Sequence, residues 1–173
     1  VSIPTFEDWR TEARSLGALA AYRHVDFSFS GRGDPQNVPG VRATPELFTV
    51  LQANAMLGRA FTRDEAVVGA DRVVGVSHGF WSRALGADAA VVGQTIRLDT
   101  VPYTVIGVMP PAFEFPTSTT VEVWAPLAFD PKDMHGRSRQ ARSLTVVGRL
   151  AEGATAARAQ DEIGVLAQRI ATE

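Results

Sequence analysis

The chain has 173 residues and a mass of 18.6 kDa, which is the size of one domain or of one domain built from two lobes. Its 45% hydrophobic and 21% charged residues are ordinary globular usage and exclude a disordered, collagen-like or coiled-coil chain. A net charge of −2 with interspersed charges argues against a nucleic-acid binder, and the absence of cysteine excludes disulfides, thiolate catalysis and cysteine-based zinc sites.

The first predicted element is a helix over residues 4–22, because apolar residues recur there at steps of three and four and form one stripe. Thr5 followed by Asp8 fits a capping box at its start, and Ser2 before Pro4 is the alternative cap. The stripe consists of Phe6, Trp9, Ala13, Leu16 and Ala20.

A hairpin is expected next, because residues 25–29 alternate between apolar and polar side chains with a period of two. Residues 31–35 form the turn and residues 36–43 the returning strand. Pro39 and Gly40 within that strand predict that it lies at a sheet edge or carries a bulge.

A short helix is predicted after this hairpin, with Thr44 as its N-cap and Pro45 in its first position. Its buried side would carry Leu47, Phe48 and Leu51, and residues 52–71 are expected to be irregular.

Short strands dominate the rest of the chain. Ser77 is expected to begin a helix that carries Trp81, and a closing helix is expected over residues 155–171, where Ala159, Ile163, Leu166 and Ile170 form a stripe. The segment Met109–Pro116 is expected to be extended and fixed by its prolines, and residues 128–142 to be a polar loop. The predicted strands are residues 72–76, 95–98, 101–108, 121–124 and 144–150, the second and third forming a hairpin about Asp99 and Thr100.

These elements predict an α+β fold with a mixed sheet and hairpins, because strict βαβ repetition is missing. We expect two lobes within a single domain of residues 1–173. One lobe would be built from both chain ends, residues 1–52 with 141–173, and the other inserted at residues 53–140.

The segment Gly75–Gly79 matches G-x-S-x-G, the nucleophile elbow of esterases, with Ser77 as the candidate nucleophile. Asp130 or Asp133 with His135 would complete a Ser-Asp-His order. The alternative is that Ser77 is the N-cap of the following helix. We favour the cap, because the chain is short for such a hydrolase, shows no separate oxyanion loop, and places Asp133 two residues from His135.

The other polar candidates have a simpler interpretation. Asp130, Asp133 and His135 are potential metal ligands, but their spacing fits no known ligand set, so a solvated loop is favoured. The arginines at 137, 139 and 142 could bind a phosphate or an acidic partner, but a solvated surface is the more common interpretation of such a charge cluster. Trp9, Trp81 and Trp124 are expected in the core, and Gly107 and Gly148 at bulges or close backbone contacts.

Seven segments taken in order resemble the periplasmic core domain of MacB-like ABC transporter permeases, and most closely the large duplicated permeases of acidobacterial type. The most telling is Tyr103–Phe113. The others are residues 6–10, residues 44–48 leading to 57–61, Val76-Ser77 with Trp81, residues 92–96, residues 123–127, and residues 147–150 with Gly153, Ala159 and Gln160.

This resemblance implies an extracytoplasmic, periplasmic domain inserted between two membrane helices, with a porter-like lobe made from both chain ends. It implies a non-catalytic role, no cofactor, and a dimer in the full-length protein. The implied partners are the permease's own membrane helices, a cytoplasmic ATPase subunit and a periplasmic adaptor. A further strand would follow the closing helix. Since the chain starts at Val1, not Met, we expect it to be a piece of a longer protein.

Met109, Pro110, Pro111, Phe113 and Phe115 are the candidate partner-docking residues, because their prolines hold two rings in a stiff presentation. The favoured alternative is that Phe113 and Phe115 seal a core. Two other functions stay open at this stage: a freestanding exported ligand-binding domain, which needs a large apolar pocket, and a small serine hydrolase that uses Ser77.

Overall fold

The computed structural model describes residues 1–31, 33–117, 119–130 and 141–172. Strands and helices alternate irregularly along the chain. In order they are α1 (Ile3–Glu12), β1 (Leu16–Ser30), β2 (Gln36–Ala43), α2 (Leu47–Val50), β3 (Leu57–Gly58), η1 (Arg63–Glu65), β4 (Val73–Val76), α3 (His78–Ala84), η2 (Ala89–Val91), β5 (Thr95–Leu98), β6 (Val101–Val108), β7 (Val123–Pro126), β8 (Thr145–Leu150) and α4 (Ala156–Thr172).

Strand pairing closes a ring, which we call the barrel. β1 pairs with β2, β2 with β7, β7 with β4, β4 with β6, β6 with β5, and β5 returns to β1. The β2–β7 and β4–β6 pairs are parallel and the others antiparallel, so the sheet is mixed. Closure gives each of these strands a neighbour on both sides, which removes open edges that would pair with other chains.

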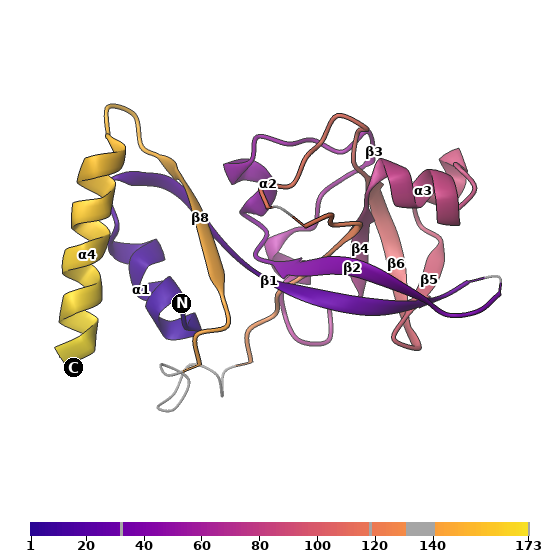
Figure 1. Ribbon diagram of the computed structural model, residues 1–173, viewed down its shortest axis with the longest axis horizontal. Coiled ribbons are helices and arrows are strands. Elements are labelled where there is room, and N and C mark those ends of the chain that lie inside the picture. The colour runs from indigo at the N-terminus through magenta and orange to yellow at the C-terminus, as the bar shows by residue number, and fades with distance from the viewer. Residues whose placement is uncertain (32, 118, 131–140, 173) are drawn as a thin grey trace.

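β1 is long enough to pair with two different strands along its length. Its first part, Leu16 to Tyr22, pairs with β8, and its second part, Tyr22 to Phe29, pairs with β2 in the barrel. α1 and α4 lie against the β1–β8 ribbon, and both chain ends lie beside them (Figure 1). We call these two helices and the ribbon the helical layer. β1 therefore runs without interruption from the helical layer into the barrel.

Side chains along β1 alternate between two cores, as the pleat of a strand requires. Leu19 and Ala21 pack with Phe6 of α1, whereas Ala20 and Tyr22 point to the other side and pack in the cluster that contains α2. A third core fills the barrel and includes Phe27, Val38, Val76, Leu98, Tyr103 and Val105.

The predicted α+β class with a mixed, hairpin-containing sheet is confirmed. The β5–β6 hairpin turns at Asp99 and Thr100, whose φ values of 54° and 63° are the positive pair that a two-residue type I′ turn needs. Where one lobe ends and the other begins stays a prediction.

The helix predicted over residues 4–22 is wrong beyond its first turns, since α1 ends at Glu12 and β1 begins at Leu16. The apolar stripe continues into β1 because the first part of this strand is buried on both faces. Its side chains therefore lack the apolar–polar alternation that would have identified a strand. Ser2, not Thr5, caps α1: its side chain accepts a hydrogen bond of 3.3 Å from the backbone N–H of Thr5.

The edge position predicted for β2 is also wrong, because β2 lies between β1 and β7. Pro39 is tolerated because pairing with β7 starts only at Gly40, and the carbonyl of Pro39 still accepts from the Glu122 N–H at 2.8 Å. Thr44 does not cap α2. Its hydroxyl instead accepts a hydrogen bond of 3.1 Å from the N–H of Ala21.

Candidate functional site

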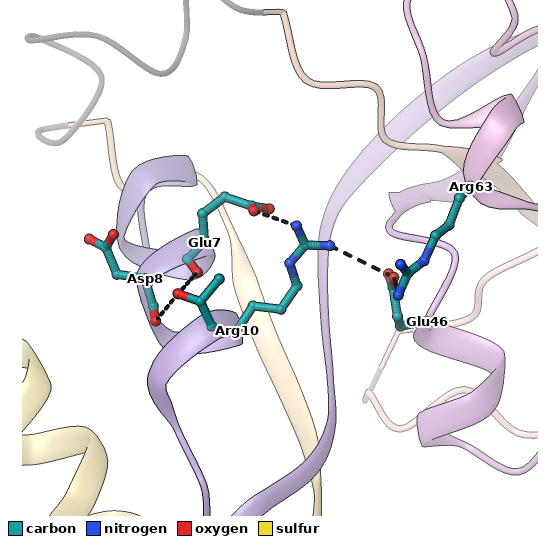
Figure 2. Close-up of polar contacts among 6 residues, drawn as sticks. Glu7, Asp8, Arg10, Glu46 and Arg63 are labelled. Carbon is teal, nitrogen blue, oxygen red and sulfur yellow. Dashed lines mark hydrogen bonds and ion pairs between the residues drawn. The ribbon is translucent and has the colours of Figure 1, made fainter.

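The helical layer and the barrel meet at a junction formed by α1, α2 and η1. Glu46, at the N-terminus of α2, faces two arginines: Arg10 of α1 at 3.9 Å and Arg63 of η1 at 3.0 Å. Figure 2 shows Arg10 between Glu7, at 2.5 Å, and Glu46, with Arg63 approaching Glu46 from the other side. The Glu46 side chain is 18% exposed, so it is the least solvated member of this bridge.

Two clefts flank this bridge. The larger, of about 530 Å³, lies between α1, the start of β1 and α2, and its wall includes Trp9, Leu16 and Thr49. The smaller, of about 280 Å³, is lined by Thr44, Leu127 and other residues on the opposite side. Arg10, Glu46 and Arg63 line both clefts. The ion pairs therefore span a gap between the helical layer and the barrel that side chains do not fill.

A second contact across the junction joins β8 to α2. The guanidinium of Arg149 donates hydrogen bonds of 2.9 Å and 2.7 Å to the carbonyl oxygen of Val50. Val50 is the last residue of α2, where a cation also meets the negative end of the helix dipole. The bond therefore ties the ribbon to the short helix that Glu46 begins.

α4 is fixed to the connection between α1 and β1 by a carboxylate. Glu162 accepts hydrogen bonds from the backbone N–H groups of Arg14, at 2.9 Å, and Ser15, at 2.8 Å. A hydrogen bond from the Ser15 side chain, together with these backbone bonds, favours the charged carboxylate and lowers the pKa of Glu162 to about 2. Arg169 of α4 also pairs with Glu12 at the end of α1. The helical layer is thus held together at both of these points.

The predicted docking segment lines a groove of about 510 Å³ on the barrel, together with α3 and the approach to β7. It is not extended as expected: Phe113 donates to the carbonyl of Pro110 at 3.0 Å, which folds the chain at Pro111. Met109 is buried, Pro110 is half-buried and Pro111 is exposed. Of these three residues, the groove therefore exposes Pro111 most.

Both phenylalanines of the segment contact core aromatics. Phe115 is 9% exposed and packs edge-on against Tyr22, with ring centroids 5.0 Å apart. Phe113 is half-buried and lies edge-on to Trp124 at 5.4 Å. Both rings therefore pack in the hydrophobic core that contains Tyr22 and Trp124. Whether the segment also docks a partner stays a prediction.

The polar side of the groove carries a charged pair. Arg83 of α3 and Glu122 lie 2.7 Å apart, and both line the groove. His78 packs edge-on against Trp81 at 5.3 Å. The indole N–H of Trp124, a buried groove residue, has no hydrogen-bond partner among the described residues.

Ser77 is a helix cap. Its hydroxyl oxygen accepts a hydrogen bond of 3.0 Å from the N–H of Phe80, which is the N-cap geometry of α3. The favoured reading of this serine is confirmed. The partners suggested for it, Asp133 and His135, lie outside the described residues.

Other sequence candidates fall partly outside the described residues as well. Of the proposed metal ligands only Asp130 is described, and of the arginine cluster only Arg142, which lines a cavity beside Trp9. Within the ranges that the structure describes, no group of three or more His, Asp or Glu side chains is placed to hold a metal ion. No helix in those ranges is long and apolar enough to cross a membrane.

Sequence reasoning missed the residues of the junction. Arg10, Glu46 and Arg149 each stand in an unremarkable local pattern, and the partners Arg149 and Val50 are 99 residues apart. Nothing in their spacing could have identified them, because sheet pairing brings them together. Glu162 was equally hidden as one acidic residue of an amphipathic helix.

The whole chain has counterparts among known proteins. The sequence matches the family described as MacB-like periplasmic core domain over residues 2–166. No curated protein matches it. The fold is similar to the crystal structure of the periplasmic region of MacB from Actinobacillus actinomycetemcomitans, with a TM-score of 0.75 at 14% identity over 98% of this chain and 74% of that chain.

A second solved structure has the same fold. It is the extracellular domain of the noncanonic ABC-type transporter YknZ from Gram-positive bacteria, with a TM-score of 0.67 at 12% identity over 94% of this chain and 78% of that chain. At identities this low, the structural similarity establishes a common fold and no more. The assignment to the family rests on the match of the sequence to the family model.

Proposed function

The chain belongs to the MacB-like periplasmic core domain family, and we propose that it is the non-catalytic extracytoplasmic domain of a MacB-like ABC transporter permease. In this role it transmits ATP-driven conformational change to substrate or partner proteins outside the inner membrane. The permease's membrane helices are its covalent partners, a cytoplasmic ATPase subunit supplies the energy, and the full-length protein is a dimer. A periplasmic adaptor is the expected external partner.

The observation that carries this proposal is the continuity of β1. Both chain ends lie in the helical layer, where membrane helices of a parent permease would attach (Figure 1). From Ala18 onward β1 is paired continuously into the barrel, first with β8 and then, from Tyr22, with β2. A displacement of the chain ends therefore reaches the barrel through a paired strand and not through a flexible linker.

The contacts at the junction set how rigidly the helical layer and the barrel move together. Arg149 and Glu46 add polar contacts on either side of α2, but the clefts beside them leave the interface incompletely packed. Such an interface allows small changes in angle between the helical layer and the barrel. The groove beside Pro110 and Pro111 lies on the barrel, which carries neither chain end, and is the surface we assign to the periplasmic adaptor.

The test uses the full-length permease with its ATPase subunit in lipid. A spin label is placed at Val68, which is 60% exposed in the segment between η1 and β4, and the distance between the labels of the two copies is measured by pulsed electron paramagnetic resonance. We expect the distance to change when ATP and vanadate are added. When the permease is assembled with an ATPase subunit whose nucleotide-binding lysine is replaced, the distance between the labels should not change.

The same preparation tests the junction. A permease with Glu46→Gln and Arg149→Met should keep its ATPase activity but show a broader, less ATP-dependent distance distribution. Identical distributions with and without ATP in the unmodified permease would refute transmission through this domain.

A further inference from the structure

Two arginines converge on one buried hydroxyl at the end of the barrel where β2 ends and β4 begins. Arg42 of β2 donates to the phenol oxygen of Tyr103 at 2.6 Å, and Arg72, just before β4, donates to the same oxygen at 3.1 Å. Their guanidinium carbons lie 5.9 Å and 5.6 Å from the centre of the Tyr103 ring. Tyr103 is 2% exposed, Arg42 is half-buried and Arg72 is exposed, so the cluster opens to solvent on the Arg72 side.

The cluster consists almost entirely of hydrogen-bond donors. A phenol oxygen has two lone pairs and one hydrogen, and the two arginines occupy both lone pairs. The O–H of Tyr103 therefore points to an acceptor, yet it has none within the described ranges. Each guanidinium has five N–H donors, of which Arg42 uses only one more, for the carbonyl of Pro126 at 3.3 Å.

No carboxylate neutralises this pair in the part of the chain that the structure describes. The ion pairs found there involve other arginines. Asp71, the nearest acid in sequence, accepts instead from the N–H of Gly69 at 3.2 Å. Two cations that share one acceptor and have no carboxylate partner among the described residues repel each other, and an anion between them would remove that repulsion.

A third arginine strengthens the positive charge. Arg23 of β1 stands directly opposite Arg42 in the antiparallel β1–β2 register, and like charges in that position destabilise a strand pair. Sequence alternation puts Arg23 on the same strand face as Phe27, whose ring lies 5.5 Å from the Arg42 guanidinium. The two opposed arginines destabilise the strand pair when no anion is bound. Their placement therefore favours a site for an anionic ligand.

We propose that Arg42, Arg72 and the Tyr103 hydroxyl form a binding site for a phosphate group. A phosphate monoester carries about −1.5 to −2 charges at neutral pH and three terminal oxygens, which match two cations and a third, neutral donor. Planar guanidinium groups are suited to bidentate phosphate contacts. A carboxylate supplies only one charge and two oxygens. The source is free phosphate or the phosphate of a lipid headgroup.

Calorimetric titration of the 173-residue chain with inorganic phosphate tests the site. We expect saturable binding, weakened at least about tenfold in Arg72→Gln, because a charge-assisted hydrogen bond is lost. Tyr103→Phe keeps the buried ring and should weaken binding severalfold. The matched control is Arg97→Gln, since Arg97 is an exposed barrel arginine whose side chain, among the described residues, donates to the Thr100 carbonyl alone, and it should bind like the unmodified chain.

Flotation with vesicles distinguishes the two sources. If free phosphate does not bind but vesicles containing phosphatidic acid, a lipid phosphate monoester, carry the chain, and Arg72→Gln abolishes this, the site takes a lipid phosphate. Equal binding of acetate and phosphate would overturn the phosphate assignment. No binding to either phosphate source, or equal binding by Arg72→Gln and the unmodified chain, would overturn the site itself.

Discussion

Arg149 and Val50 are joined by two hydrogen bonds, of 2.9 Å and 2.7 Å, from one guanidinium group to one carbonyl oxygen. The contact connects β8 of the helical layer to the end of α2. A helix end leaves its last carbonyls without partners inside the helix, so a donor from elsewhere, such as a side chain or water, satisfies them. Arg149 fills this need from a strand that is distant in sequence, and the barrel and the helical layer are held together as a result.

Replacing Arg149 with Met keeps the aliphatic stem but removes both donors. We expect the free energy of unfolding to fall by about 1.5 kcal/mol, the usual value of a hydrogen bond to a charged group that is partly open to solvent. Urea denaturation followed by tryptophan fluorescence measures it. Arg14→Met is the control, because the side chain of Arg14 is exposed and, among the described residues, only its backbone N–H is hydrogen-bonded. Equal losses in both variants would contradict the proposed importance of the contact.

The pKa of Glu162 predicts how stability depends on pH. This pKa is about 2 in the folded chain because hydrogen bonds from Ser15 and Arg14 favour the carboxylate, against an ordinary value of 4.5. A folded pKa below the unfolded one means that the stabilisation is present above about pH 4.5 and is lost as the pH falls towards 2. The difference in stability between the unmodified chain and Glu162→Gln should therefore shrink over that window.

Urea midpoints at pH 7, 4.5 and 3 measure this difference. Glu152→Gln is the control, because Glu152 lies in the exposed turn before α4 and should show no comparable loss. A difference for Glu162→Gln that stays constant down to pH 3 would show that the two backbone hydrogen bonds do not depend on the charge of the carboxylate.

Local signals in the sequence were sufficient for most strands and for the cap at Ser77, but not for the caps of α1 and α2. The β5–β6 hairpin follows from apolar alternation around Asp99 and Thr100, and Ser77 was identified as a cap from the strand–helix change at that point. These features depend on contacts within a few residues. Sequence reasoning reaches such contacts because the partners stand side by side in the chain.

Features set by distant contacts were not predictable. Residues 16–22 carry an apolar run that fits a helix, and only pairing with β8 makes them a strand. Ring closure depends on β7 entering between β2 and β4, which no local pattern reveals. The same is true of the junction and of the cluster at Tyr103, whose arginines come from β2 and from the residue before β4. The family resemblance supplied the function class but none of these contacts.

Truncating Phe115 tests whether the docking segment is first of all part of the core. Phe115→Ala removes a buried ring that contacts Tyr22 and Trp124, and we expect a loss of about 3–4 kcal/mol. Pro111→Ala, on the exposed turn of the same segment, should change stability by less than about 0.5 kcal/mol. Urea denaturation checks both values. A fully stable Phe115→Ala would mean that the ring is available to a partner.

Glycine at position 107 is required by the close approach of another strand. A Cβ atom there would lie 2.4 Å from the carbonyl oxygen of Arg59, which follows the short strand β3. Because that oxygen belongs to backbone, relief requires β3 to move away from β6. Gly107→Ala should therefore destabilise the chain by about 2–3 kcal/mol, as overpacking does in well-packed interiors.

Gly75 is the matched control for Gly107, since the two residues are partners in the β4–β6 register. A Cβ at Gly75 would meet nothing closer than 4.0 Å, so Gly75→Ala should leave stability nearly unchanged or raise it slightly. Thermal unfolding of both variants measures the contrast. If Gly107→Ala were as stable as Gly75→Ala, β3 would be free to separate from β6, and the barrel would not depend on this contact for its shape.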